Sequence, residues 1–293
     1  MIKECSYIHL NQCVDIALIR NTIPESNSAY CPTTEKAIRS DFENLIEDPN
    51  SLILGYFSED ILLAIFGFYF NNDSNNWVDC LGPFFLNEWD ERIAIDMFSY
   101  ATTKLPISSR FNFFFNTKNT NLHNLMSNIN AKRSDNEYIL NLYRDGFIKK
   151  ENDHIVVKYS EKYKNDIIEL HDEVHKNMYI TGNDIISSIG IDREVFCALS
   201  DDNRFVGYGV LKRYKDKKRH ITAEVFTVKE EYRGMGYGRA VLNAVILNAF
   251  YRYNANTVDL VVDKLNLNAR ELYFSCGFKL ETENASYYLQ KSN

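Results

Sequence analysis

The sequence predicts an α/β protein that consists of two similar units, and three observations support this prediction. Stretches that alternate apolar and polar residues, as β-strands do, are interspersed with stretches whose apolar residues recur at helical spacing. The 293 residues are enough for two ordinary domains, each with its own core. Composition also changes near residue 150, because all five prolines lie at or before Pro106 and eight of the twelve glycines follow residue 150.

In the second unit, residues 151–293, strands and helices flank a glycine-rich loop. We expect strands at 154–159, 195–199, 204–214, 220–228, 257–262 and 278–290. We expect helices at 164–176, from the loop to about residue 253, and at 268–276, with residues 178–190 helical or a loop. The helix after the loop is well supported, because Val241, Val245 and Ala249 share one face. Gly277 suits the left-handed residue that ends many helices.

The first unit, residues 1–150, repeats this outline. We expect helices at 13–20, 34–47 and 93–105, a hairpin at 51–70, and strands at 77–86 and 110–115. The stretch "NTKNTNLHNLMSNINAKRSDNEYILNLYR" also aligns without gaps on "DKLNLNARELYFSCGFKLETENASYYLQK". That register matches Asn119 with Asn266 and Leu125 with Leu272, and it predicts an internal duplication whose halves join near residues 145–153.

Composition and charge exclude several classes of protein. The net charge is −7, with 13 basic and 19 acidic residues in 1–150 and 20 and 21 in 151–293, so a nucleic-acid binder is disfavoured. No run approaches the roughly 20 apolar residues of a membrane span, and the N-terminus does not resemble a signal peptide. The six cysteines are scattered without paired spacing, which favours a reduced, cytoplasmic location. The acidity is compatible with a cationic, amine-bearing substrate, although solubility explains it equally well.

The loop "EEYRGMGYGRAV" places three glycines between a predicted strand and a predicted helix. A dinucleotide fingerprint would need glycine where Arg239 stands, and the lysine of a Walker loop is missing. Arg233, Gly236 and Gly238 fit R-x-x-G-x-G. Its successive amides would face a concavity at a helix N-terminus, where a pyrophosphate is the natural ligand. The alternative is a tight strand-to-helix turn that happens to be rich in glycine.

Two motifs together resemble the GNAT superfamily of acyltransferases, which use acetyl-CoA or another acyl-CoA. "FTVKEEYRGMGYGRAV" carries R-x-x-G-x-G, and "NLNARELYFSCGF" carries N-x-x-A-x-x-L-Y-x-x-x-G-F about thirty residues later. The resemblance is strong for residues 151–293 and extends to 1–150 by layout only. It implies two GNAT-like domains, each a mixed, mostly antiparallel sheet flanked by helices, of which 151–293 is the catalytic one.

The resemblance also implies roles for particular residues. The strand before the loop would be splayed from its neighbour, so that the backbone of Phe226, Thr227 and Val228 pairs with pantetheine. Asn266 would hydrogen-bond the pantetheine arm, and Tyr273 would protonate the departing thiolate. The pyrophosphate would be bound by the backbone amides of the loop, which are those of Arg233, Gly234, Met235, Gly236, Tyr237, Gly238 and Arg239. A core tyrosine is the alternative for Tyr273.

Acyl transfer to an amine requires a base that removes a proton from the ammonium. Glu224 is our first candidate, because strand alternation would place it on the same side as Phe226, two residues later. An ordinary solvent-facing strand glutamate is the alternative. Asp259 and Asp263, on and just after the neighbouring strand, are the next candidates.

Other polar motifs suggest no further chemistry. "HDEVH" puts His171 and His175 on one helix face, but the zincin pattern needs glutamate at Asp172, so we expect a solvated helix face and no metal site. The basic turn "KDKK" is more consistent with a solvated hairpin tip than with a contact to CoA. Cys197 and Cys276 are expected to be buried packing residues.

The first unit lacks this chemistry. Where the second unit has "KEEYRGMGYG", the first has "NEWDERIAID", whose carboxylates Glu88, Asp90 and Glu91 would repel a pyrophosphate. Met126 stands where the second unit has Tyr273. We therefore predict that 1–150 is a degenerate domain and that 151–293 acetylates a primary amine by direct attack. A non-catalytic acyl-CoA sensor is the alternative, and the chain is expected to be a monomer with a pseudo-dimer of domains, or a homodimer.

Overall fold

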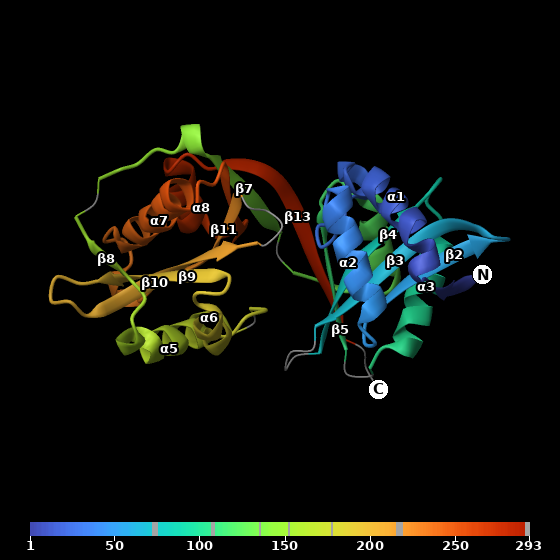
Figure 1. Cartoon of the computed structure of the whole chain (residues 1–293), viewed down its shortest axis with the longest axis horizontal. Helices are drawn as coiled ribbons and strands as arrows, with labels where there is room; N and C mark the ends of the chain where they lie inside the picture. The colour runs from blue at the N-terminus through green and yellow to red at the C-terminus, as the bar shows by residue number, and fades with distance from the viewer. Residues whose placement is uncertain are drawn as a thin grey trace. The chain divides into compact units, whose positions relative to one another are not determined.

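The protein forms two compact units, each a β-sheet with helices against it (Figure 1). A computed structural model describes residues 1–71, 76–106, 109–134, 136–151, 153–176, 178–214 and 219–290. Unit 1 comprises residues 1–137 and 282–293, and unit 2 comprises residues 138–281. The sheets are mixed and mostly antiparallel, which confirms the predicted fold class.

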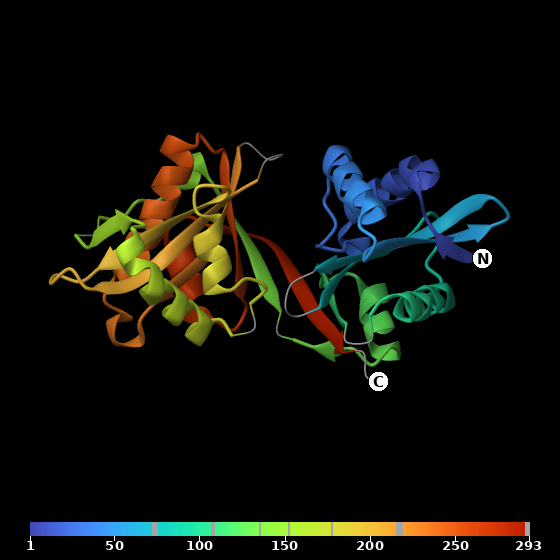
Figure 2. The same cartoon turned by 60° about the horizontal axis from the view of Figure 1, so that its bottom comes forward.

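Unit 1 has the strand order β1-β2-β3-β4-β5-β13, in which β4 and β5 are parallel and the other pairs of described register are antiparallel. The strands are β1 (Ile2–Glu4), β2 (Leu52–Ser58), β3 (Ile61–Asn71), β4 (Trp77–Phe85), β5 (Arg110–Asn116) and β13 (Lys279–Gln290), with β6 (Lys132–Arg133) against β13. The helices are α1 (Leu10–Asn21), α2 (Glu35–Glu47), α3 (Glu91–Lys104) and α4 (Thr120–Asn128). Figure 2 shows α1 and α2 on one face of this sheet and α3 and α4 on the other.

Unit 2 has the strand order β7-β12-β11-β10-β9-β8, in which β11 and β12 are parallel. The strands are β7 (Glu137–Tyr143), β8 (Ile155–Lys158), β9 (Arg193–Leu199), β10 (Phe205–Arg213), β11 (His220–Val228) and β12 (Thr257–Asp263). The helices are α5 (Lys164–Val174), α6 (Gly182–Ser188), α7 (Tyr237–Leu247) and α8 (Leu267–Ser275). Short turns complete the chain, namely the 3-10 helices η1 (Tyr7–His9), η2 (Pro24–Ser26), η3 (Arg144–Gly146), η4 (Glu161–Tyr163) and η5 (Glu230–Tyr232), and the π-helical η6 (Asn248–Arg252).

Each unit has an apolar core on both faces of its sheet. In unit 2, α5 and α6 cover a cluster that contains Val195, Tyr208 and Val225, whereas α7 and α8 cover one that contains Ile221 and Ala223. Burial of a large apolar side chain contributes roughly 1.5–3 kcal/mol, so these layers hold the helices on the sheet.

The two units have matching local geometry. The parallel pair β4–β5 is registered at Trp77–Asp79 with Arg110–Asn112, and the parallel pair β11–β12 at His220–Thr222 with Thr257–Asp259. Asn119 caps α4 through the amide of Leu122, and Asn266 caps α8 through the amide of Ala269 in the same way. The aligned positions of the sequence therefore occupy equivalent places.

The last strands of the two halves are exchanged. In the Asn119–Asn266 register, residues 137–143 of β7 correspond to residues 284–290 of β13. Yet residues 284–290 pair with β5 in unit 1, and β7 neighbours β12 in unit 2. The chain therefore passes from unit 1 to unit 2 between residues 137 and 138, and back to unit 1 between residues 281 and 282. The boundary that we predicted at 150/151 lies inside unit 2. A duplication seen in sequence does not reveal which half each equivalent strand joins.

Candidate active site

Strands β11 and β12 separate in the middle of the unit 2 sheet. Their described pairing ends at Thr222 and Asp259, although β11 continues to Val228 and β12 to Asp263. On its other edge, β11 stays paired with β10 up to Val228. The backbone of residues 226–228 therefore has an edge toward the gap, as the resemblance implied. The side chain of Thr227 is buried and is held by His175, whose Nε2 lies 2.6 Å from Oγ1.

A β-bulge changes the direction of Glu224. Val210 is registered with Val225 and Leu211 with Ala223, so Glu224 is the extra residue on β11. A bulge breaks strand alternation and re-aims side chains. Glu224 contacts Arg193 and Lys212, which lie two residues from Val195 and Val210 and so on the face of the sheet under α5 and α6. Phe226 packs against the cluster under α7 and α8, on the other face. Our prediction that Glu224 and Phe226 project on the same side is wrong for this reason.

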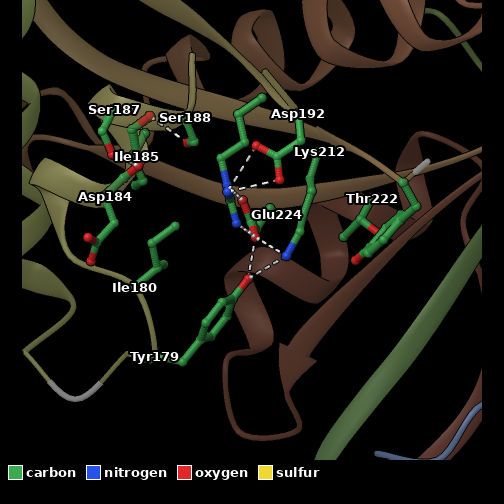
Figure 3. A network of polar contacts seen from close by, with 12 residues as sticks. Tyr179, Ile180, Asp184, Ile185, Ser187, Ser188, Asp192, Lys212, Thr222 and Glu224 are labelled. Atoms are coloured by element: carbon green, nitrogen blue, oxygen red, sulfur yellow. Dashed lines mark hydrogen bonds and ion pairs between the residues drawn. The ribbon is translucent and has the colours of Figure 1, made fainter. Parts of the chain in front are cut away.

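The carboxylate of Glu224 lies in a dense polar network (Figure 3). Arg193 donates from Nε to Oε2 at 2.6 Å and from Nη2 to Oε1 at 2.8 Å. Lys212 Nζ lies 3.1 Å from Oε1, and the hydroxyl of Tyr179 also donates to that oxygen. Burial raises the pKa of Glu224, but the hydrogen bonds from Arg193 and Tyr179 and the charge of Lys212 outweigh it and lower the pKa. The group stays ionised, and it is a weaker proton acceptor than a free carboxylate.

Sequence analysis did not identify Tyr179, Arg193 or Lys212 as neighbours of Glu224. The available signal was the presence of a cationic residue near one end of each of two neighbouring, mostly apolar strands. Arg193 begins β9 and Lys212 lies near the end of β10, and the two are register partners. Facing cations in a sheet need a shared anion, and Glu224 supplies it.

The next candidates for the base have structural partners. Asp259 accepts from Thr222 and lies 2.8 Å from His220 Nε2, while Asp263 accepts the amide of Leu265 at 2.7 Å. These contacts fix the ends of β11 and β12.

The glycine loop forms a helix N-terminus that carries no side-chain cap. Gly234 and Gly236 have φ of +76° and +94°, values that favour glycine, and α7 begins directly after Gly236. Among the described residues, no side chain hydrogen-bonds the amides of Tyr237, Gly238 or Arg239, and the first turn of α7 contains no acidic residue. Arg233 supports the loop, because its Nε donates to the carbonyl of Val228 at 3.1 Å. These amides are the feature that an anionic ligand requires.

Neither backbone conformation nor packing requires glycine at position 238. Gly238 lies in the first turn of α7 without a positive φ, and a Cβ there would meet Leu272 at 3.6 Å and Val228 at 3.9 Å, which are ordinary contacts.

His154 also holds the loop in place. Its Nε2 donates to the carbonyl of Met235 at 2.6 Å, and its ring stacks on Tyr237. The contacts of Arg233 and His154 therefore fix the loop, while the space next to Gly238 stays open.

Asn266 and Tyr273 lie on α8, beside the loop. The Oδ1 of Asn266 caps the helix, and its Nδ2 has no partner among the described residues. Tyr273 is 8% exposed, with its ring 6.3 Å from that of Phe226 and 5.9 Å from that of Phe278. Burial raises the pKa of Tyr273 to about 12, so the phenol stays protonated near neutral pH. Its hydroxyl, too, has no hydrogen-bond partner in the described part of the chain.

The equivalent groups in unit 1 are occupied by the protein itself. The Asp90 carboxylate caps α3 by accepting the amides of Arg92 at 2.9 Å and Ile93 at 3.1 Å. Asn119 Nδ2 donates to the carbonyl of Asn27 at 3.1 Å. Arg20 donates to the carbonyls of Phe85, Leu86 and Asn87 at the end of β4. In unit 1 the protein itself thus satisfies the first helix amides and the asparagine amide, whose equivalents at Tyr237, Gly238 and Asn266 have no side-chain partner in the described part of unit 2.

The remaining motifs are structural. His171 of "HDEVH" is fully buried, so our expectation of a solvated helix face is wrong. It hydrogen-bonds Tyr208 and Ile180, and among the described residues no group of three His, Cys, Asp or Glu could hold a metal ion. All six cysteines are free and buried. The "KDKK" turn lies outside the described residues, and in the described ranges no helix is both long and apolar enough to cross a membrane.

Known proteins share this fold. The sequence model of the Acetyltransferase (GNAT) family matches residues 161–278. An uncharacterised N-acetyltransferase of Methanocaldococcus jannaschii is 30% identical over 134 residues, which are 46% of this chain and 83% of that protein. Among solved structures, a GCN5-related N-acetyltransferase from Sphaerobacter thermophilus has a TM-score of 0.75 at 12% identity, covering 100% of this chain and 96% of that one. A tandem GNAT protein from the clavulanic acid biosynthesis pathway has a TM-score of 0.67 at 12% identity, covering 100% and 99%.

The fold, the match to the family model and the archaeal relative define the class of this protein. The chain belongs to the GNAT family of acetyltransferases. Acyl transfer is the activity of this family, and acetyl-CoA is its general acyl donor.

Proposed function

We propose that unit 2 transfers an acetyl group from acetyl-CoA to a primary amine by direct attack. One observation supports this most strongly, namely the difference between two equivalent helix N-termini. In the described ranges, the amides of Tyr237 and Gly238 at the start of α7 have no side-chain cap, whereas those of Arg92 and Ile93 at the start of α3 are bound by Asp90. An anion stabilises a helix N-terminus, so α7 offers a place for the CoA pyrophosphate and α3 does not.

The described residues fit acetyl-CoA in three ways. The loop amides after Arg233 lie at the start of α7, and the open Gly238 leaves room for a phosphate. The amide of Arg233, which we expected to take part, donates instead to the carbonyl of Glu230 at 3.1 Å. The backbone of 226–228 borders the gap between β11 and β12, where an extended pantetheine arm would pair. The free Nδ2 of Asn266 is a donor for an amide carbonyl of that arm.

Tyr273 is the proposed donor to the leaving sulfur. The amine nitrogen forms a bond to the acetyl carbonyl carbon, the carbon–sulfur bond breaks, and the amine loses a proton while the thiolate gains one. The pKa of Tyr273 is about 12, whereas a thiol has an ordinary pKa near 8.5. The phenol therefore holds its proton more tightly than the thiol does. Tyr273 therefore stabilises the developing thiolate chiefly by donating a hydrogen bond to the sulfur, rather than by transferring its proton.

For Glu224, the contacts favour a positioning role over the predicted role of base. Its pKa is lowered, and Arg193, Lys212 and Tyr179 already bond both of its oxygens. We propose that the carboxylate orders the acceptor side of the site at the bulge, and that solvent takes the proton from the amine.

The test is an acetyl-CoA assay on the full chain with a panel of primary amines, including polyamines, amino acids, aminoglycosides and peptides. We expect one CoA thiol to be released for each acetyl group that mass spectrometry finds on an amine. A sensor would bind acetyl-CoA without releasing CoA above the buffer control for any amine. The variant Tyr273→Phe serves as the matched control, because it keeps the ring and removes the donor.

A further inference from the structure

A buried histidine of α5 connects several elements around the candidate site. His171 is fully buried, and its Nε2 lies 2.8 Å from the carbonyl oxygen of Ile180. A carbonyl only accepts, so Nε2 carries a proton and donates to it. The hydroxyl of Tyr208 lies 2.6 Å from Nδ1. Both ring nitrogens therefore have a hydrogen-bond partner.

The chain of contacts continues from Tyr208 to β11. Tyr208 and Thr227 are register partners on neighbouring strands, so their side chains lie side by side on one face of the sheet. The Thr227 hydroxyl is in turn bonded by Nε2 of His175. Residues of α5, β10 and β11 thus form one buried network, and it includes a residue of the strand that borders the proposed pantetheine position.

The same histidine fixes the segment that bears Tyr179. His171 holds the carbonyl of Ile180, and Asp172 accepts the amide of Gly182 at 2.8 Å. A Cβ at Gly182 would lie 2.6 Å from the Cα of Ile168, so α6 packs closely on α5. Tyr179 lies between these contacts and the site: half of its surface is exposed, and its hydroxyl reaches the buried Glu224.

We infer that His171 is a positioning residue for the acceptor side of the site. It fixes the Ile180 carbonyl, and this aims the Tyr179 hydroxyl at Glu224 on the bulge of β11. An apolar residue would fill the same space, and burying an imidazole costs free energy unless both nitrogens are bonded. The two bonds point to a role beyond packing. This inference rests on the proposed function, because it assigns the Tyr179 side of unit 2 to the amine acceptor.

Hydrogen exchange tests the positioning without any knowledge of the acceptor. His171→Asn removes the group that reaches Ile180, whereas His171→Gln keeps a donor near the position of Nε2. We expect faster exchange of the amides at 178–182 in His171→Asn, and protection close to the native level in His171→Gln. His175→Leu is the matched control, because it removes the other histidine of α5 and leaves the Ile180 contact. Equal exchange at 178–182 in all four proteins would overturn the inference.

Kinetics test whether the positioning matters for transfer. With an acceptor from the amine panel, we expect His171→Asn to lower kcat/KM for the amine roughly five- to tenfold, the effect of one hydrogen bond. The Kd of acetyl-CoA should stay within about twofold. In a Tyr179→Phe background, the same substitution should have little further effect, because the group that it positions is already gone.

The outcomes separate the two proposals. An equal loss of kcat/KM with and without the Tyr179 hydroxyl, or a parallel loss of acetyl-CoA affinity, would overturn the positioning role. If the wild-type chain acetylates no amine, the proposed function fails, and hydrogen exchange still decides whether His171 fixes Tyr179.

Discussion

Arg193 holds both carboxylate oxygens of Glu224, with Nε 2.6 Å from Oε2 and Nη2 2.8 Å from Oε1. The two side chains are 9% and 3% exposed. The pair joins β9 to the bulge of β11 under α5 and α6, and it explains why a carboxylate that sequence analysis interpreted as a base is instead held by cations.

Glu224→Gln should destabilise the protein. The amide keeps the size of the side chain but leaves Lys212 without its carboxylate and Arg193 with only the partly exposed Asp192, 3.2 Å from Nη1. Breaking a buried ion pair from one side typically costs about 3–5 kcal/mol. Urea denaturation should show a loss of this order. Asp202→Asn is the control, because its pair with Arg204 is exposed and such pairs are worth about 0–1 kcal/mol. Similar losses for both variants would contradict the account of the network.

Glu224→Gln should also lower the acetylation rate without changing its dependence on pH. The lowered pKa keeps Glu224 ionised near neutrality, so its removal deletes no group that titrates there. We expect the profiles of kcat/KM for wild type and variant to run parallel between about pH 6 and 9. Recovery of the variant toward the pKa of the amine, near 10, would instead identify Glu224 as the base.

Tyr273→Phe should slow the chemical step and leave acetyl-CoA affinity nearly unchanged. The ring stays packed between Phe226 and Phe278, while the donor to the sulfur is lost. Loss of one such hydrogen-bond donor to a developing anion is worth roughly 10²–10³-fold in rate. Single-turnover kinetics should be used, since slow product release would mask the effect in the steady state. An unchanged single-turnover rate would exclude Tyr273 as the donor.

His175 should make the protein less stable in acid. Burial and the nearby His171 lower the pKa of His175 to about 4, from an ordinary value of 6.5. The native state therefore favours the neutral ring, and its contribution is complete above about pH 6.5 and is lost as the pH falls toward 4. After allowance for the partial exposure of His175, we expect the free energy of unfolding to fall by roughly 1–2 kcal/mol over this pH range. His175→Gln should remove this part of the pH dependence, and an unchanged slope of stability between pH 6.5 and 4 would contradict it.

Much of the fold was predictable from the sequence, because local patterns determine local structure. The alternation of apolar and polar residues predicted β11 with the bounds that the structure shows. Gly277 follows α8 with a φ of +98°, as expected for a helix end. The open amides of the glycine loop follow from the same local reasoning. The equivalence of Asn119 and Asn266 was visible because both cap a helix, a requirement of a few neighbouring residues.

Other features depend on tertiary contacts. The bulge at Glu224 is set by pairing with β10, so alternation along β11 alone misplaced the side chain. His171 is polar and resembles a surface residue in sequence, yet Tyr208 and Ile180 satisfy it in the core. The exchange of β7 and β13 leaves both sheets with equivalent strands, so no local pattern distinguishes it.

The most direct test of the central claim is a calorimetric titration of acetyl-CoA into the full chain and its Gly238→Asp and Gly238→Asn variants. Gly238 has neither a positive φ nor close neighbours, and an aspartate in the first turn of a helix favours the helix, so both variants should fold. We predict one site per chain in wild type, weaker binding in Gly238→Asn, and none detectable in Gly238→Asp, which puts a carboxylate where the pyrophosphate should lie. Two equal sites in wild type, or unchanged binding in Gly238→Asp, would contradict the claim that the α7 loop of unit 2 receives acetyl-CoA.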